Sequence, residues 1–104
     1  MENRTMGDYK IYLHLCKING KVYIGQTNRK NIKDRFGKDG HRYYQCPRFG
    51  AAIKKYGWEN FSFLILDKNL SSEEADYKEQ FYISLYHSTD KNYGYNISEG
   101  GNYK

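Results

Sequence analysis

Two short segments that flank Asn19-Gly20 constrain the fold of this 104-residue chain most. From residue 9 to residue 16, apolar and polar side chains alternate, and this period of two predicts a β-strand. Asn-Gly is the strongest short hairpin signal, because both residues accept the positive φ angles of a type I′ turn. The apolar segment Val22–Gly25 then predicts the returning strand of a β-hairpin.

A two-residue turn at Asn19-Gly20 fixes the register of this predicted hairpin. It pairs Cys16 with Tyr23 and His14 with Gly25. Tyr12 and Tyr23 then lie on the same face of the sheet, opposite the buried apolar face. They are separated by four residues along the strand, about 13 Å at about 3.3 Å per residue.

The rest of the chain predicts one more strand and three helices. These elements are a short helix around Ile32 and Phe36 with Thr27 or Asn28 as N-cap, a helix from Pro47 that ends at Gly57, a largely buried strand over residues 61–66, and a helix from the Ser71/Glu74 capping box to about Tyr86. We interpret residues 1–8 as a flexible leader, 9–101 as one domain and 102–104 as a tail.

Charge is distributed unevenly along the chain. Residues 29–55 contain nine Lys or Arg and two Asp, a net charge of +7, whereas residues 56–101 contain three Lys and eight Asp or Glu, a net charge of −5. A basic middle segment of this kind is typical of a phosphate-binding face. No apolar run approaches the roughly 20 residues of a membrane span. Two cysteines provide no disulfide framework, so we expect a cytoplasmic protein without a membrane partner.

Glu79 is the most informative single residue of the predicted third helix. At 100° per residue it falls among Ala75, Tyr82 and Ile83 rather than on the polar face with Asp76. A carboxylate in an aromatic stripe must be paired, hydrogen-bonded, protonated or bound to metal. A structural hydrogen bond to a tyrosine or to Arg35 and an open Mg²⁺ site are both compatible with this position.

The chain resembles the GIY-YIG nuclease family, and most closely its phage homing-endonuclease branch. Lys10-Ile11-Tyr12 and Tyr23-Ile24-Gly25, separated by ten residues, resemble the two signature segments. The resemblance continues through Gln26-Thr27, Arg35, residues 52–61, Glu79 and residues 94–101. It implies an α+β fold with a small three-stranded antiparallel sheet flanked by about three helices, in agreement with the elements above.

The resemblance also implies a metal-dependent DNA endonuclease with a tyrosine, arginine and glutamate site. It implies one Mg²⁺ or Mn²⁺ per active site, with Glu79 as metal ligand, and it implies no obligate protein partner. Tyr12 would activate or position the attacking water, Tyr23 would bind the scissile phosphate or support Tyr12, and Arg35 would stabilise the charge developing on phosphorus. The resemblance further assigns His41 as an assistant to the tyrosine and Asn96 as the residue that organises the site. His14 is an alternative to His41, because His41 is separated from Arg35 by two glycines.

DNA is the expected partner, in a bacterial or phage-infected host cell. The basic residues expected to contact it are Lys10, Arg35, Lys38, Arg42, Arg48, Lys54 and Lys55. Lys10 replaces the glycine with which the family signature begins, so it tests whether that position needs glycine. A structure-specific repair nuclease and a catalytically weak nucleic-acid-binding domain of the same fold are the alternative functions.

Overall fold

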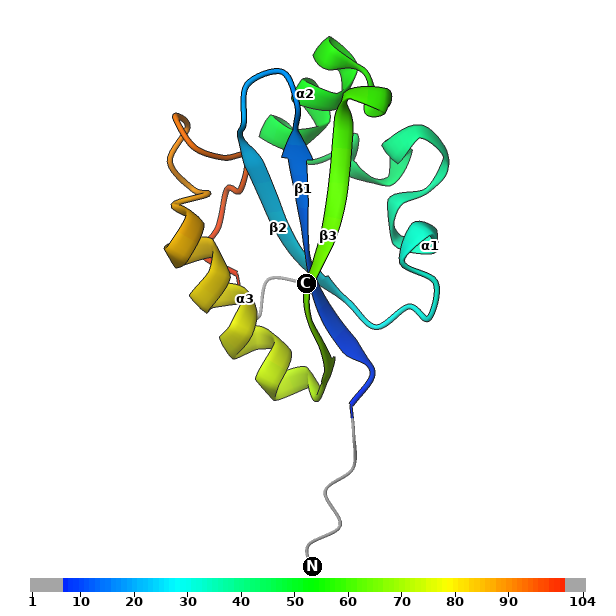
Figure 1. Cartoon of the computed structure of the whole chain (residues 1–104), viewed down its shortest axis with the longest axis vertical. Coiled ribbons are helices and arrows are strands. Elements are labelled where there is room, and N and C mark those ends of the chain that lie inside the picture. Colours follow the sequence, from blue (N-terminus) through cyan, green and yellow to red (C-terminus); the bar gives the residue numbers. More distant parts are fainter. Residues whose placement is uncertain (1–6, 101–104) are drawn as a thin grey trace, which may run out of the picture.

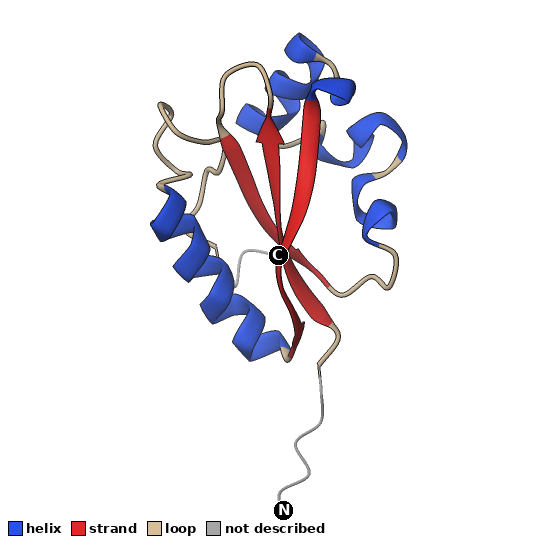
Figure 2. Cartoon of the chain, in the orientation of Figure 1, coloured by secondary structure: helices blue, strands red, loops and turns tan. Residues whose placement is uncertain are grey.

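Three antiparallel strands in the order β2-β1-β3 form the centre of the computed structural model, which describes residues 7–100. The strands are β1 (Tyr9–Cys16), β2 (Val22–Thr27) and β3 (Phe61–Leu70). The helices are α1 (Ile32–Phe36), η1 (Lys38–Tyr43), α2 (Pro47–Tyr56), η2 (Trp58–Asn60) and α3 (Ser72–Tyr86). Helices lie on both sides of the sheet (Figures 1 and 2), which confirms the predicted α+β class.

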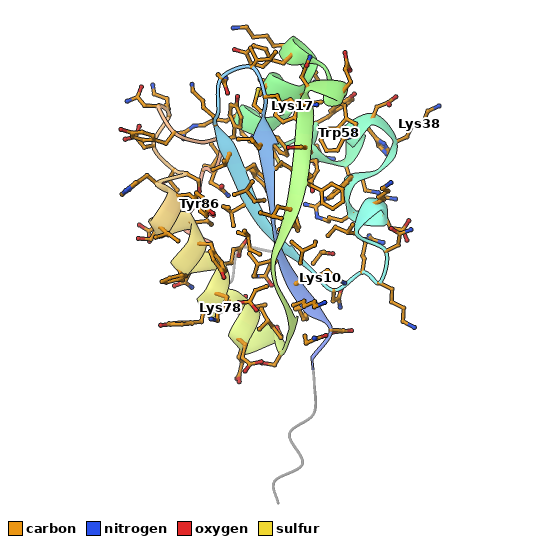
Figure 3. All side chains as sticks on the ribbon, in the orientation of Figure 1. Lys10, Lys17, Lys38, Trp58, Lys78 and Tyr86 are labelled. Atoms are coloured by element: carbon orange, nitrogen blue, oxygen red, sulfur yellow. The ribbon has the colours of Figure 1, made fainter. Side chains whose placement is uncertain are left out.

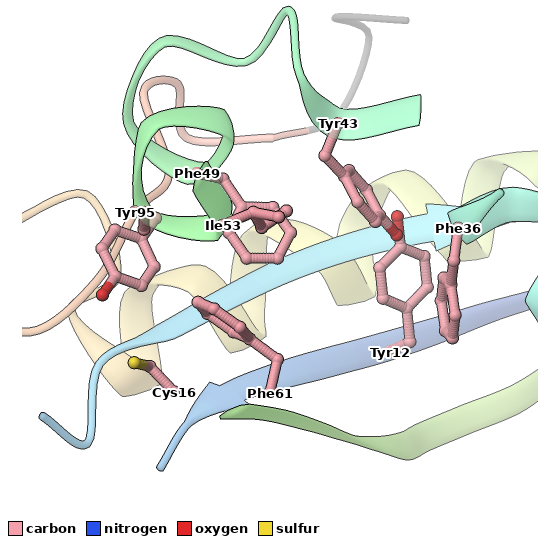
Figure 4. Close-up of a cluster of buried hydrophobic side chains, with 9 residues drawn as sticks. Tyr12, Cys16, Phe36, Tyr43, Phe49, Ile53, Phe61 and Tyr95 are labelled. Atoms are coloured by element: carbon pink, nitrogen blue, oxygen red, sulfur yellow. The ribbon is translucent and has the colours of Figure 1, made fainter. Parts of the chain in front are cut away.

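Each face of the sheet carries its own buried cluster. On the α3 side, Ile11, Leu13 and Ile24 pack with Ala75 and Ile83 of the helix. The opposite face is aromatic, and Figure 4 shows much of this cluster. Its buried members are Tyr12, Cys16, Phe36, Tyr43, Phe49, Ala52, Ile53, Phe61 and Tyr95. The alternation in the first strand therefore predicts correctly which side chains share a face.

The predicted hairpin register is wrong by two residues. Tyr12 pairs with Gly25 and His14 pairs with Tyr23. The turn is longer than expected, since the Cys16 amide donates to the Lys21 carbonyl at 2.9 Å. Gly20 takes a positive φ of 78°, but Asn19 does not, so the type I′ turn does not form. A shift of two preserves the faces and brings Tyr12 two residues, about 6.6 Å, from the partner of Tyr23.

The third strand departs from the expectation of a largely buried segment. In the described part of the chain, β3 pairs with β1 alone and is an edge of the sheet, and it continues to Leu70 rather than ending at residue 66. Phe63 is 41% exposed and Leu64 is 57% exposed. β1 is the central strand of the sheet, so β3 lies at the edge and part of its apolar side chains is exposed.

The ends of the helices follow their capping chemistry. Asn31, not Thr27 or Asn28, is the N-cap of α1, and its side chain accepts from the Lys33 amide at 3.0 Å. α2 begins at Pro47 and is followed by Gly57, as predicted. The Ser71/Glu74 capping box opens α3 with both of its hydrogen bonds present. No helix in the described range is long and apolar enough to cross a membrane.

The predicted leader and tail fall mostly on residues 1–6 and 101–104, which lie outside the described residues. Gly7 and Asp8, the described end of the leader, precede β1 without regular structure.

Candidate active site

Five of the six residues predicted to be catalytic line one cavity of about 620 Å³. They are Tyr12, Tyr23, Arg35, Glu79 and Asn96. The cavity receives side chains from β1, β2, α1, α3 and the segment that follows α3. Residues 67 positions apart in the sequence, such as Tyr12 and Glu79, therefore meet at one open concave site.

Tyr12 lies across Gly25, the glycine that ends the second signature segment. The two residues are directly paired in adjacent strands, and the Tyr12 side chain is fully buried. A Cβ atom at position 25 would overlap the hydroxyl end of the Tyr12 ring. Gly25 is therefore required by the close approach of Tyr12 rather than by an unusual backbone angle, since its φ is not positive.

Tyr23 is fixed by a stack with Phe49 of α2. The two ring centroids are 4.4 Å apart and the planes differ by 9°. Burial raises the pKa of both Tyr12 and Tyr23, and the Arg35 guanidinium acts in the opposite direction. Burial prevails at both residues, so both hydroxyls are protonated at neutral pH.

Arg35 reaches the cavity from α1, a helix of only five residues. The helix is held to the sheet by Phe36, which is 3% exposed and packs on Tyr12. The Arg35 Cζ lies 4.6 Å from the centre of the Tyr43 ring, within the range of a cation–π contact. This contact directs a half-buried guanidinium toward the two tyrosines.

Glu79 lies on α3 with its carboxylate bound by Gln26 of β2. The Gln26 Nε2 donates to Glu79 Oε1 at 2.8 Å and to Asp76 Oδ1 at 3.0 Å. One amide therefore bridges two carboxylates on adjacent turns of one helix. Asp76 was predicted to lie on the polar face, but its spacing of three residues from Glu79 places both side chains at Gln26.

The donor set at Glu79 fits a hard divalent cation bound mainly through water and phosphate. Glu79 supplies carboxylate oxygen at the cavity wall, the ligand type that Mg²⁺ and Mn²⁺ prefer. Across residues 7–100, no group of three or more His, Cys, Asp or Glu side chains could enclose an ion. Mg²⁺ commonly binds through one or two carboxylates and keeps several waters, so a single carboxylate at the cavity is sufficient to hold it together with substrate phosphate.

His41 does not line the cavity. It is exposed, and its Nδ1 lies 2.8 Å from the Lys38 carbonyl. Gly37 follows the last residue of α1, and positive φ angles at Asp39 and Gly40 redirect η1, which carries His41 outward. The two glycines between Arg35 and His41 indicate this break in the sequence, but they do not indicate the direction in which η1 carries the histidine.

Tyr43 occupies the place next to Tyr12 that the histidine was expected to fill. The two rings point toward each other with their hydroxyl ends (Figure 4). The Tyr43 hydroxyl lies 3.0 Å from Nε2 of His14, which is 1% exposed. Burial, and then the Arg35 charge, lowers the pKa of His14 to about 3, so the ring is neutral. His14 thus supports Tyr43 from within the core.

Asn96 acts on the backbone of β2. Its Oδ1 accepts from the Ile24 amide and its Nδ2 donates to the Ile24 carbonyl, each at 2.9 Å. These two bonds continue the hydrogen bonding of the sheet at the β2 edge. Asn96 is buried, and its role in the structure is to hold the segment after α3 against the cavity.

The predicted DNA-contacting residues have different environments. Lys38, Arg42, Lys54 and Lys55 are exposed. Figure 3 shows Lys38 on the α1 side of the sheet, away from Lys78 of α3. The Lys10 Nζ donates to the Arg29 carbonyl at 2.8 Å. Arg48 is half-buried, and its Nη1 donates to the Thr89 and Asn96 carbonyls at 2.8 and 3.0 Å.

Known proteins resemble this chain in sequence and in structure. The chain is 40% identical over 84 residues to segE of Enterobacteria phage T4, a protein assigned as an endonuclease. The match covers 81% of this chain and 38% of segE, so the chain spans well under half of that relative.

Two solved structures of the catalytic domain of the homing endonuclease I-TevI have the same fold. One has a TM-score of 0.68 at 21% identity and covers 88% of this chain and 96% of the I-TevI chain. The other has a TM-score of 0.65 at 24% identity and covers 86% and 98%. The GIY-YIG catalytic domain family matches residues 8–96. The chain is therefore a member of the GIY-YIG catalytic domain family.

Proposed function

We propose that this domain is a DNA endonuclease that hydrolyses phosphodiester bonds with one divalent metal ion, Mg²⁺ or Mn²⁺, in the cavity. The observation that carries the proposal is the convergence of Arg35, Glu79 and two tyrosines on one open cavity. A guanidinium and a carboxylate facing the same space suit a reaction in which negative charge grows on phosphorus. The phage relative supports the proposal, and with it we infer that the domain acts in the cytoplasm of an infected bacterial cell.

In this proposal the scissile phosphate lies between Arg35 and Glu79. Arg35 donates to the non-bridging phosphate oxygens, and its charge stabilises the five-coordinate state. Glu79 would hold the divalent ion, which when bound supplies Lewis-acid stabilisation of the phosphate. Gln26 fixes the orientation of the Glu79 carboxylate through its 2.8 Å bond.

The two tyrosines contribute as protonated hydroxyls at neutral pH. Tyr23 would donate to the phosphate, and Tyr12 would orient the attacking water at the floor of the cavity. The water oxygen forms a bond to phosphorus as the P–O3′ bond breaks, which leaves a 5′-phosphate and a 3′-hydroxyl. The attacking water loses its proton to solvent in the open cavity and the departing O3′ oxygen gains one from solvent, so Tyr12 stays protonated throughout.

A plasmid cleavage assay tests the proposed function. Wild-type protein is expected to nick or linearise supercoiled plasmid with Mg²⁺ or Mn²⁺, and a chelator should abolish the reaction. Arg35→Ala should lose activity by at least about 100-fold, because the guanidinium stabilises the transition state. Arg29→Ala, which removes an exposed arginine that neither lines the cavity nor belongs to the residues expected to contact DNA, is the matched control. Metal-independent cleavage, or equal activity of the two variants, would refute the proposal.

A further inference from the structure

A second cavity, of about 370 Å³, lies beside the catalytic cavity and is lined by four cations. They are Lys21, Arg48, Lys55 and Lys91. Pro47, the first residue of α2, lines both cavities, so the two are neighbours at that residue. The β1–β2 turn, α2 and the loop after α3 meet at the same end of the molecule (Figure 1). We call this second cavity the basic groove.

Two of these cations lie on one face of α2. Arg48 and Lys55 are seven residues apart, which places them about 20° apart around the helix and about 10 Å apart along it. Ala51 and Ala52 lie between them and also line the groove. Their short side chains leave a shallow floor that an extended polymer can approach.

Lys21 and Lys91 supply the other side of the groove from distant parts of the chain. Lys91 belongs to the acidic stretch of residues 56–101, yet it lines the same cavity as residues of the basic helix α2. The loop that carries Lys91 is tied to β2 by bonds from Val22 to Tyr93 and from Tyr95 to Val22, at 3.1 and 2.9 Å. Among residues 7–100, no acidic residue lines the groove.

We propose that the basic groove binds the DNA sugar-phosphate backbone next to the scissile phosphate. This inference rests on the proposed function, because it assigns the path of the same substrate. Arg48 and Lys55, about 10 Å apart along α2, match the span of roughly three phosphates of one strand at about 3.4 Å of helix axis per phosphate, and Lys21 and Lys91 add positive charge on the other side of the groove. Arg48 lines the groove next to Pro47, the residue that lines both cavities. Its Nη1 bonds to the Thr89 and Asn96 carbonyls fix the guanidinium there.

Salt-dependent binding to a fluorescent 30-base-pair duplex of random sequence tests the groove. The measurement is made in chelator, so it does not depend on cleavage. Lys21→Gln/Lys91→Gln should lower the slope of log K against log salt by about 2, because each phosphate contact contributes about 0.9. Lys68→Gln/Lys78→Gln removes the same charge outside the groove and should leave the slope unchanged.

A second pair of variants places charge on the floor of the groove without removing a contact. Ala51 is exposed within α2, so Ala51→Glu and Ala51→Gln both keep the helix. Ala51→Glu should weaken binding by at least about tenfold relative to Ala51→Gln, because its charge faces the phosphates.

Three results would overturn the proposal that the groove binds DNA. They are equal slopes for the two lysine pairs, equal affinity for the two Ala51 variants, and no duplex binding by wild type. The proposed function is judged separately by plasmid cleavage. If wild type cleaves plasmid but the groove variants bind DNA as their controls do, only the proposal for the groove is rejected. If the groove variants alter DNA binding but wild type does not cleave plasmid, only the proposed endonuclease activity is rejected.

Discussion

At the scale of single residues, Gly25 and Tyr12 explain why the two signature segments occur together. The first segment supplies Tyr12, whose ring lies across the neighbouring strand. The second segment supplies Gly25 at the paired position, where a Cβ atom would overlap that ring. Lys10 has no comparable constraint. It lies in β1 without a positive φ, and its Nζ reaches the Arg29 carbonyl. The lysine at the start of the first segment is therefore compatible with this fold.

Gly25→Ala is expected to displace the Tyr12 hydroxyl while keeping the sheet intact. A misplacement of about 1 Å at a reacting group costs about 100-fold in rate, so cleavage should fall by about that factor. The cleavage rate and the thermal midpoint should be measured on the same preparations. Wild-type activity in Gly25→Ala would show that Tyr12 does not need its present position.

His14 couples the aromatic core to pH. A neutral histidine with a pKa of about 3 in the fold and about 6.5 in the unfolded chain disfavours protonation of the folded state. Its contribution to stability is therefore fully present above about pH 6.5 and is lost as the pH falls toward 3. The window between about pH 6.5 and about pH 5 lies above the titration of ordinary carboxylates.

Urea unfolding across that window should show the effect of His14. The free energy of unfolding of wild type is expected to fall by about 1.4 kcal/mol for each pH unit below about 6.5. His14→Gln should flatten this dependence, whereas His41→Gln, at an exposed histidine, should retain it. A wild-type stability that does not change between about pH 6.5 and about pH 5 would contradict a neutral buried His14.

At the scale of elements, the segment after α3 behaves as an addition to the sheet. Asn96 bonds both polar backbone atoms of Ile24, and the Asn96 amide donates to the Ser88 carbonyl at 2.9 Å. Gly94 also bridges to Val22. Because this segment forms one wall of the catalytic cavity, its attachment to β2 determines the shape of the site.

Asn96→Ala should therefore lower stability and activity together. It leaves the amide and carbonyl of Ile24 buried without partners, which costs about 3 kcal/mol in the free energy of unfolding. Asn92→Ala, in the exposed loop before it, is the matched control. If Asn96→Ala lost cleavage while its urea midpoint stayed at the wild-type value, Asn96 would instead contact the substrate.

Local chemistry predicts some of these elements from sequence and misses others. Pro47, Gly57 and the Ser71 capping box mark their helices correctly because those signals act within one turn. The hairpin register fails because the turn type depends on whether Asn19 adopts a positive φ, which the Asn-Gly pair permits but does not enforce. The exposure of β3 depends on strand order, which no single segment encodes.

At the scale of the whole molecule, the site is assembled from both faces and several elements. Glu79 could be singled out from sequence because a charge in an apolar stripe is locally inconsistent. The sequence does not predict that Gln26 binds Glu79 or that Tyr43 lies beside Tyr12 and His14. These contacts join segments that only the fold brings together. The basic segment of residues 29–55 was visible, but the position of Lys91 beside it was not.

The most direct test of the catalytic cavity is the single-turnover cleavage rate of a labelled duplex by wild type and Glu79→Gln, at saturating protein with Mg²⁺. Gln keeps the shape of the side chain and removes the charge that would hold the metal. The predicted result is a loss of at least about 100-fold for Glu79→Gln, because the transition state loses the charge that the metal supplies, with ligatable 5′-phosphate ends from wild type. Glu73→Gln, at an exposed residue of the same helix, should cut at the wild-type rate. Equal rates for wild type and Glu79→Gln would contradict the assignment of this cavity as the hydrolytic site.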